Sequence, residues 1–156
     1  MRLQDFMAER YEGIGRFVAH WIETTRPEIR TWLPPVPGSA MTRTIADMLA
    51  EFTCVNRYVL SAFGQGTAPE GHPMHARPDF DTLEEGIATF LAGVQAVAAC
   101  YRTMDDADLE AEHTFAGRTI RGVDMLEIPY RNLCYHGGQI NLLQLLAGDS
   151  EMHRPK

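Results

Sequence analysis

The chain has 156 residues, of which 45% are hydrophobic and 22% are charged. This length predicts one domain, spanning residues 1–156, with a core of its own. The formal net charge of −7, from 14 Lys and Arg against 21 Asp and Glu, argues against nucleic-acid binding, which needs clustered cations.

Neither a secretory signal nor a membrane span is expected. The first ten residues already include Asp5 and Glu9, and no window approaches 18 uninterrupted apolar residues. The three cysteines, Cys54, Cys100 and Cys134, form no Cys-x-x-Cys pair. We therefore expect a cytoplasmic protein with reduced thiols and no membrane partner.

Two helices are predicted in the first half of the chain. The first covers about residues 3–25 and is broken at Pro27, and a connector with three prolines within residues 34–37 follows. The second begins near Thr44, where Thr44 and Asp47 are spaced as a capping box, and is stopped by Gly64 and Gly66. A long loop, residues 64–80, comes next.

The second half predicts two more helices. A capping box of Asp81 and Glu84 opens the third, which runs to about Tyr101. Residues 104–122 are irregular, with a small hairpin about Ala116-Gly117. The fourth helix starts near Pro129, as a first-turn proline, after a short helical turn. The pattern predicts an all-α four-helix bundle with long connectors.

One histidine lies on the buried stripe of the fourth helix. The stripe recurs at steps of three and four and consists of Leu133, His136, Ile140, Leu143 and Ala147. A polar ring there must find a partner or a metal. Gly137 and Gly138 follow it, and each glycine costs a helix about 1 kcal/mol relative to alanine. We expect both glycines to be places of close approach.

The segment His136-Gly137-Gly138-Gln139-Ile140 resembles the last helix of the DinB/YfiT family of bacterial helix-bundle proteins. That family carries two histidines four residues apart in this helix and a third in a Leu-x-His step of its second helix. Here the corresponding positions are Asn132 and, in Leu49-Ala50-Glu51, Glu51.

The resemblance implies an up-down-down-up bundle and, in many members, a divalent metal bound by three histidines. It also implies thiol-dependent transferase chemistry and a link to stress induced by DNA damage. Carried over residue by residue, the candidate metal ligands are Glu51, Asn132 and His136. Zn²⁺, Ni²⁺ or Mn²⁺ are the candidate ions, since imidazole and carboxylate are good ligands and an amide oxygen is a weak one.

Two interpretations of these residues remain open. In the first, the protein is a metal-dependent transferase or hydrolase, with His136 as anchor ligand, Glu51 as second ligand or general base, and Asn132 as weak ligand or substrate orienter. In the second, Glu51 accepts hydrogen bonds from His136 and Asn132 without a metal. The protein is then a non-catalytic bundle that binds a small molecule or a partner protein.

Two further expectations concern loops and association. His72 and His75 form a His-x-x-His pair in the long loop, a weak metal signal that more often marks solvated residues. The fourth helix adds Leu142, Leu145 and Leu146 around its core stripe. So much apolar surface predicts a two-fold homodimer. The alternative is cover within one chain, from the connector around Trp32 or from residues 104–122.

Overall fold

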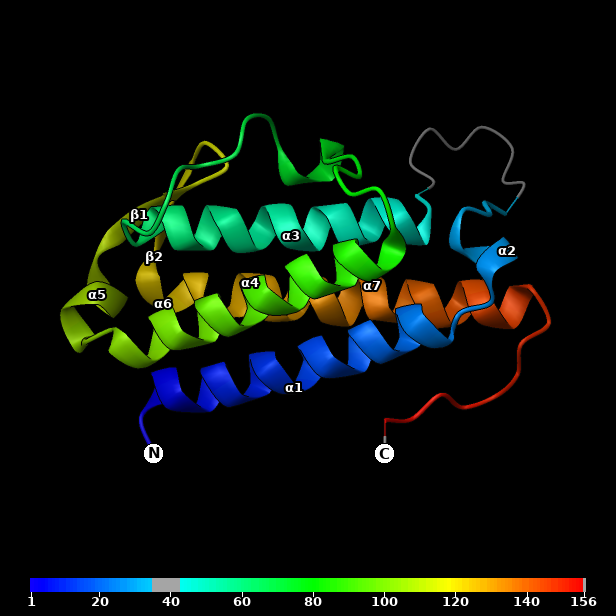
Figure 1. The fold of residues 1–156 in the computed structure, drawn as a ribbon. Coiled ribbons are helices and arrows are strands. Elements are labelled where there is room, and N and C mark those ends of the chain that lie inside the picture. Colours follow the sequence, from blue (N-terminus) through cyan, green and yellow to red (C-terminus); the bar gives the residue numbers. More distant parts are fainter. Residues whose placement is uncertain (35–42, 156) are drawn as a thin grey trace.

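The structure is a computed structural model that describes residues 1–34 and 43–155. Four long helices form a bundle: α1 (Leu3–Thr24), α3 (Ile45–Ala62), α4 (Leu83–Thr103) and α7 (Glu127–Leu146) (Figure 1). Shorter elements fill the connections: α2 (Pro27–Arg30), the 3₁₀ helix η1 (Pro73–His75), α5 (Asp106–Glu110), β1 (Glu112–Phe115), β2 (Arg118–Arg121) and α6 (Gly122–Met125). The predicted all-α four-helix bundle is confirmed.

The helices run up, down, down and up (Figure 1). The end of α1 lies beside the end of α7, where Gln144 Nε2 donates to the Trp21 carbonyl at 3.1 Å. The end of α4 lies beside the start of α1, where Arg2 Nη2 donates to the Arg102 carbonyl at 2.9 Å. This arrangement is the topology that the family resemblance implied.

The core runs along the centre of the bundle, where all four long helices contribute buried side chains. Phe52 of α3 and Phe90 of α4 pack with ring centroids 5.4 Å apart. Among residues 1–34 and 43–155, only α4 is long and apolar enough to cross a membrane by composition. Its buried face, which includes Ile87, Phe90, Val94 and Tyr101, belongs to this core.

One of the two predicted capping boxes is confirmed, and the other is wrong by one residue. The box at the start of α3 is present, since Asp47 N donates to Thr44 Oγ1 and Thr44 N donates to Asp47 Oδ2, both at 3.1 Å. The predicted box of Asp81 and Glu84 is wrong by one residue: α4 is capped by Thr82 and Glu85. The sequence holds two overlapping pairs with the same spacing, and only the later one leaves Leu83 as the first helical residue.

The irregular segment forms the predicted hairpin. Phe115 pairs with Arg118 across Ala116 and Gly117, whose φ values of 48° and 78° give the left-handed turn of a tight hairpin. His113 of β1 ties this hairpin to the helices. Its ring nitrogens lie 3.1 Å from the Ala62 carbonyl and 3.0 Å from the Asp108 carbonyl.

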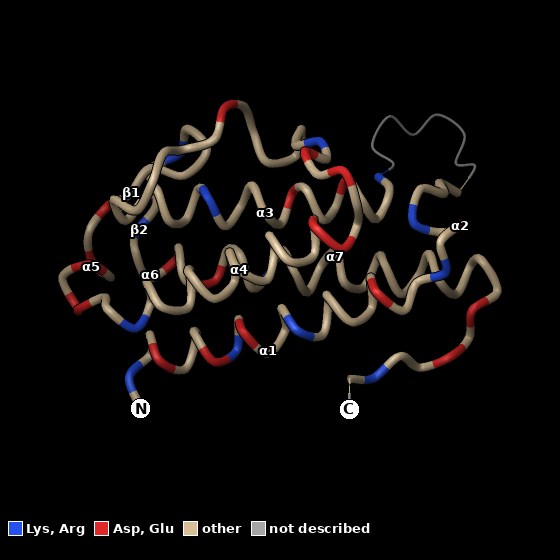
Figure 2. The backbone as a smooth tube through the Cα atoms, viewed as in Figure 1, with Lys and Arg blue, Asp and Glu red and all other residues tan. Residues whose placement is uncertain are grey.

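Charged residues are distributed over many elements (Figure 2). Acidic side chains occur on α1, α5, the loops and the tail, and basic side chains stand singly among them. The α1 helix, for example, alternates acidic residues such as Glu9 and Glu12 with Arg10 and Arg16. Acidic and basic residues therefore alternate along α1, and this helix carries no continuous patch of one charge.

The two glycines after His136 differ from each other, and only Gly137 meets the expectation of close approach. A Cβ on Gly137 would lie 2.8 Å from Trp21 Cζ3, so α1 and α7 approach closely there. Gly138 is exposed, and a Cβ on it would meet nothing within 4 Å. The expectation of close approach is therefore wrong for Gly138, because successive helical residues point about 100° apart and only the first faces α1.

We expect opposite effects from alanine at these two positions. Gly138→Ala should raise the free energy of unfolding by about 1 kcal/mol, because it restores helix propensity without a clash. Gly137→Ala should lower it by about 1 kcal/mol, because overpacking against Trp21 outweighs the same gain. Urea unfolding of the two variants measures both changes. Equal effects at the two positions would contradict the packing of α1 on α7.

Candidate functional site

The three side chains singled out from the sequence meet between α3 and α7. Asn132 Nδ2 donates to Glu51 Oε1 at 3.0 Å, and His136 Nε2 lies 3.4 Å from the same oxygen. The exposed fractions of Glu51 and His136 are 5% and 7%. The start of α3 lies beside the middle of α7. This brings together Glu51 and Asn132, which are 81 positions apart in the sequence. Their roles as ligands or catalytic groups stay predictions.

Arg43 completes this cluster, and sequence reasoning did not find it. Its guanidinium donates to Glu51 Oε2, and the two side chains are 13% and 6% exposed. Arg43 comes directly before Thr44, the residue that caps α3, and it lies eight positions from Glu51. Arg43 lies before the first residue of α3, so the regular spacing of helix faces does not relate it to Glu51, which is two turns into the helix. Only the three-dimensional structure reveals that the two side chains meet.

The His136 ring is held on two sides. Nδ1 donates to Gln139 Oε1 at 2.6 Å, and the ring packs edge-on against Phe52 at a centroid distance of 5.7 Å. Burial and the positive charge of Arg43 lower the pKa of His136, and the bond to Gln139 opposes this only in part. With the proton on Nδ1, Nε2 is the unprotonated nitrogen of the ring, and it lies 3.4 Å from Glu51 Oε1.

One polar atom in the cluster has no partner. Asn132 Oδ1 is buried and accepts no hydrogen bond within the residues that the structure describes. Such a group costs about 1–3 kcal/mol relative to its hydrated state.

A pocket of about 480 Å³ opens over this cluster. Its polar floor consists of Arg43, Glu51, Asn132, His136 and Gln139. Its other lining residues are Pro34, Met48, Met74, Tyr135, Leu142, Leu143 and Leu146. The size, apolar walls and few converging polar groups are typical of a small-molecule site.

The described residues do not fit the metal centre that the resemblance implies. Only His136 and Glu51 are strong ligands, and the Asn132 amide presents its NH₂ group to Glu51. A guanidinium already neutralises the carboxylate, and it would repel a divalent ion. Within residues 1–34 and 43–155, no three His, Cys, Asp or Glu side chains are arranged to hold a metal.

The long loop reaches the pocket through a methionine and not through its histidines. His72 and His75 are exposed, with ring centroids 6.3 Å apart, and His72 Nδ1 accepts from the Met74 backbone at 3.2 Å. Met74, between them, lines the pocket. The His72 side chain thus caps the start of η1.

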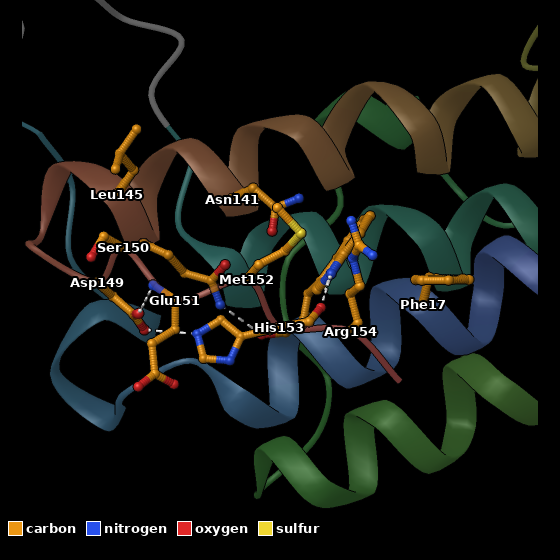
Figure 3. A pocket seen from close by; sticks show the side chains of 11 residues that line it. Phe17, Asn141, Leu145, Asp149, Ser150, Glu151, Met152, His153 and Arg154 are labelled. Atoms are coloured by element: carbon orange, nitrogen blue, oxygen red, sulfur yellow. Dashed lines mark hydrogen bonds and ion pairs between the residues drawn. The ribbon is translucent and has the colours of Figure 1, made fainter. Parts of the chain in front are cut away.

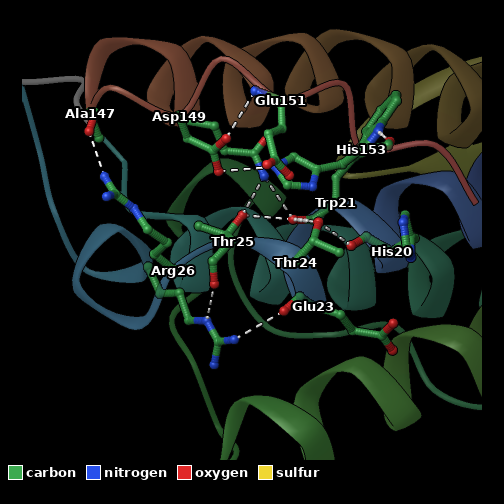
Figure 4. A network of polar contacts seen from close by, with 12 residues as sticks. His20, Trp21, Glu23, Thr24, Thr25, Arg26, Ala147, Asp149, Glu151 and His153 are labelled. Carbon is green, nitrogen blue, oxygen red and sulfur yellow. Dashed lines mark hydrogen bonds and ion pairs between the residues drawn. The ribbon is translucent and has the colours of Figure 1, made fainter.

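A second pocket, of about 350 Å³, lies between α1, α7 and the C-terminal tail (Figure 3). Phe17, Leu145 and Met152 supply apolar lining. The tail is fixed there by Trp21 Nε1, which donates to the His153 carbonyl at 2.8 Å, and by the contact of His153 with Asp149 at 3.0 Å (Figure 4). These bonds explain why Trp21 is a rigid neighbour for Gly137.

The state of His136 predicts a pH effect on folding. Its pKa is 6.5 in the unfolded chain and lower in the folded protein. As the pH falls below about 6.5, the unfolded chain therefore gains a proton that the folded protein does not, and the free energy of unfolding falls. His136→Gln should remove this part of the pH dependence of the free energy of unfolding between pH 6.5 and 5. An unchanged slope in His136→Gln would contradict a neutral, buried imidazole.

Comparison with known proteins supports the fold. No family model matches the sequence, and no curated protein matches it. Among solved structures, a DinB-like protein from Bacillus cereus ATCC 10987 superposes with a TM-score of 0.54 and 16% sequence identity. The match covers 96% of this chain and 90% of that chain. The chain therefore has the helical-bundle fold of the DinB-like proteins.

Proposed function

We propose that this chain is a DinB-fold binding protein that takes a small molecule into the pocket between α3 and α7 without a metal ion. The observation that carries the proposal is the buried contact of Arg43 with Glu51. It supplies the positive charge that a metal would otherwise bring to the carboxylate. The polar floor is then a fixed recognition surface, and the apolar walls hold the body of the ligand.

The physical basis is charge balance in a poorly hydrated site. A carboxylate that is 6% exposed needs a cation or several donors. Glu51 has both, since Arg43 contacts Oε2 and Asn132 donates to Oε1. Removing only the guanidinium would leave the carboxylate short of charge compensation, which for buried pairs costs about 3–5 kcal/mol.

The metal-dependent transferase or hydrolase implied by the family resemblance is the second candidate. One observation favours it: a buried imidazole stands beside a carboxylate in a pocket of small-molecule size. In that case His136 and Glu51 would carry the chemistry, as the sequence indicated. Metal content separates the two candidates.

Tag-free protein should retain far less than stoichiometric metal after incubation with Zn²⁺, Ni²⁺ or Mn²⁺ and desalting. The matched control replaces Glu51 and Asn132 by histidine, which restores the three-histidine set, together with Arg43→Ala. This control should bind zinc stoichiometrically. The double histidine variant that keeps Arg43 should bind it more weakly, because the unpaired guanidinium repels the ion. Elemental analysis measures the metal content of all three proteins, and stoichiometric metal in the unaltered one would refute the proposal.

We also propose that the protein is a homodimer that buries the outer side of α7. Tyr135, Leu142, Leu145 and Leu146 are exposed by 65%, 53%, 58% and 57%, more apolar surface than one helix of a monomer usually leaves open. All except Leu145 also line the pocket, so a partner chain on this face would cover part of the pocket wall. Residues 104–122 lie at the other end of the bundle from the α7 leucines (Figure 1). Residues 35–42 of the proline-rich connector are outside the described part of the chain.

Light scattering at micromolar concentration tests this association. We expect a mass of twice 17.5 kDa, reduced to a single chain by Leu145→Glu, because a charge in an apolar interface loses its hydration. Leu3→Glu, an exposed leucine (46%) at the opposite end of the bundle, should leave the mass unchanged. A single-chain mass for the unaltered protein would end the dimer proposal without touching the pocket.

A further inference from the structure

The imidazole of His113 lies between two backbone carbonyl oxygens where the hairpin meets the helices. Nδ1 is 3.1 Å from the oxygen of Ala62, the last residue of α3, and Nε2 is 3.0 Å from the oxygen of Asp108 on α5. A carbonyl oxygen accepts hydrogen bonds and cannot donate them. A neutral imidazole has one N–H and donates to one of the two oxygens, whereas an imidazolium donates to both. The geometry therefore fits the protonated ring.

Two neighbours of the His113 ring favour its positive charge. The Ala62 carbonyl belongs to the C-terminal end of α3, where the helix dipole attracts cations. The ring centroid of Phe63 lies 4.4 Å from that of His113, within the range in which an aromatic ring stabilises a cation. In a neutral ring, by contrast, the unprotonated nitrogen would direct its lone pair at a carbonyl oxygen within hydrogen-bond distance, which is repulsive.

The charged side chains around this ring are mainly acidic. Residues 58–62 of α3 carry no charge, and Arg57 before them is exposed. On β2, Arg118 and Arg121 are exposed, and Arg121 pairs with Asp124 at 3.2 Å. On α4, burial and the charge of Asp108 raise the pKa of Cys100, so its thiol stays neutral. The acidic residues of α5, its cap, β1 and the loop before η1 are Asp105, Asp106, Asp108, Glu110, Glu112 and Glu70. This excess of carboxylates also favours an imidazolium.

The His113 ring holds one side of a hollow of about 640 Å³ between the hairpin and residues 66–69. The loop on the other side is fixed to α3 by the Tyr58 hydroxyl, which donates to the Pro69 carbonyl at 2.9 Å. The hairpin packs Phe115 on Tyr58, with ring centroids 5.4 Å apart. Within residues 1–34 and 43–155, the only side-chain hydrogen bonds from the hairpin to α3 or α5 are the two of His113.

We infer that His113 is a proton-dependent anchor of the hairpin: its imidazolium form holds β1 on the C-terminal end of α3 and on α5, and loss of the proton loosens the hairpin and widens the hollow beside it. Protonation favours the anchored form. The anchor therefore weakens as the pH rises through the range in which imidazoles lose their proton, about pH 5 to 8. His136 acts with the opposite sign, because the folded protein holds it neutral.

Hydrogen exchange of the full-length protein at about pH 5.5 and about pH 8 tests this anchor. Protection factors, which correct for the intrinsic pH dependence of exchange, are compared for residues 112–121. We expect them to fall by roughly tenfold or more from the lower to the higher pH, the factor that loss of one hydrogen bond from a charged donor makes. A fall confined to the hairpin cannot come from unfolding of the whole chain, since His136 makes that rarer at the higher pH.

Two variants assign the effect to one ring. His113→Gln places a neutral amide there, whose charge does not change with pH, so hairpin protection should be low and equal at both pH values. His75→Gln is the matched control. It alters an exposed histidine at the end of η1, outside the hairpin, and should keep the full fall.

The ¹⁵N resonances of the imidazole report the proton directly and need no variant. We expect two protonated ring nitrogens at about pH 5.5 and one at about pH 8, with hairpin amide signals that change at the same midpoint as the ring. Equal hairpin protection at both pH values in the unaltered protein overturns the inference, as does a ring that is already neutral at the lower pH. A fall of the same size in His113→Gln also overturns it, because another group would then cause the effect.

Discussion

The buried carboxylate of Glu51 is the constraint on which the site depends. Isolated, it would be strongly unfavourable at 5% exposure. It is acceptable here because Arg43 and Asn132 donate to its two oxygens. The guanidinium gives a site whose charge is built into the chain and does not depend on ion supply.

The bundle makes this cluster possible by bringing the start of α3 beside the middle of α7. The close approach of α1 and α7 at Gly137 fixes the other side of α7 against Trp21. The ring of His136, one residue earlier, is thereby directed toward α3 and Phe52. In α7, the packing of Gly137 against Trp21 thus fixes the direction in which the neighbouring His136 side chain points.

The fold was largely predictable from the sequence because its signals are local. Apolar stripes, the Thr44–Asp47 cap and the Ala116-Gly117 turn each involve residues within a few positions of one another, and the structure has all three. The start of α4 was missed by one residue because two capping pairs compete there. The prediction was wrong for Gly138 because neighbouring residues of a helix point in different directions. Gly137 faces α1, and Gly138 faces away from it.

The site was only partly predictable. The juxtaposition of Glu51, Asn132 and His136 followed from the family spacing, but its chemical character did not. Arg43 lies outside the helix, so no periodicity connects it to Glu51, and its positive charge beside the carboxylate was not expected. Likewise, which nitrogen of His136 carries the proton depends on its contact with Gln139. The two residues are close in sequence, but the sequence does not show which ring nitrogen faces the amide.

The central claim is that a guanidinium, and not a metal ion, compensates Glu51. Crystals soaked in a zinc salt and measured on both sides of the zinc absorption edge test it directly. The account predicts Arg43 in contact with Glu51 and no anomalous peak between Glu51 and His136. A strong anomalous peak within about 2 Å of both side chains, with Arg43 turned away, would contradict it.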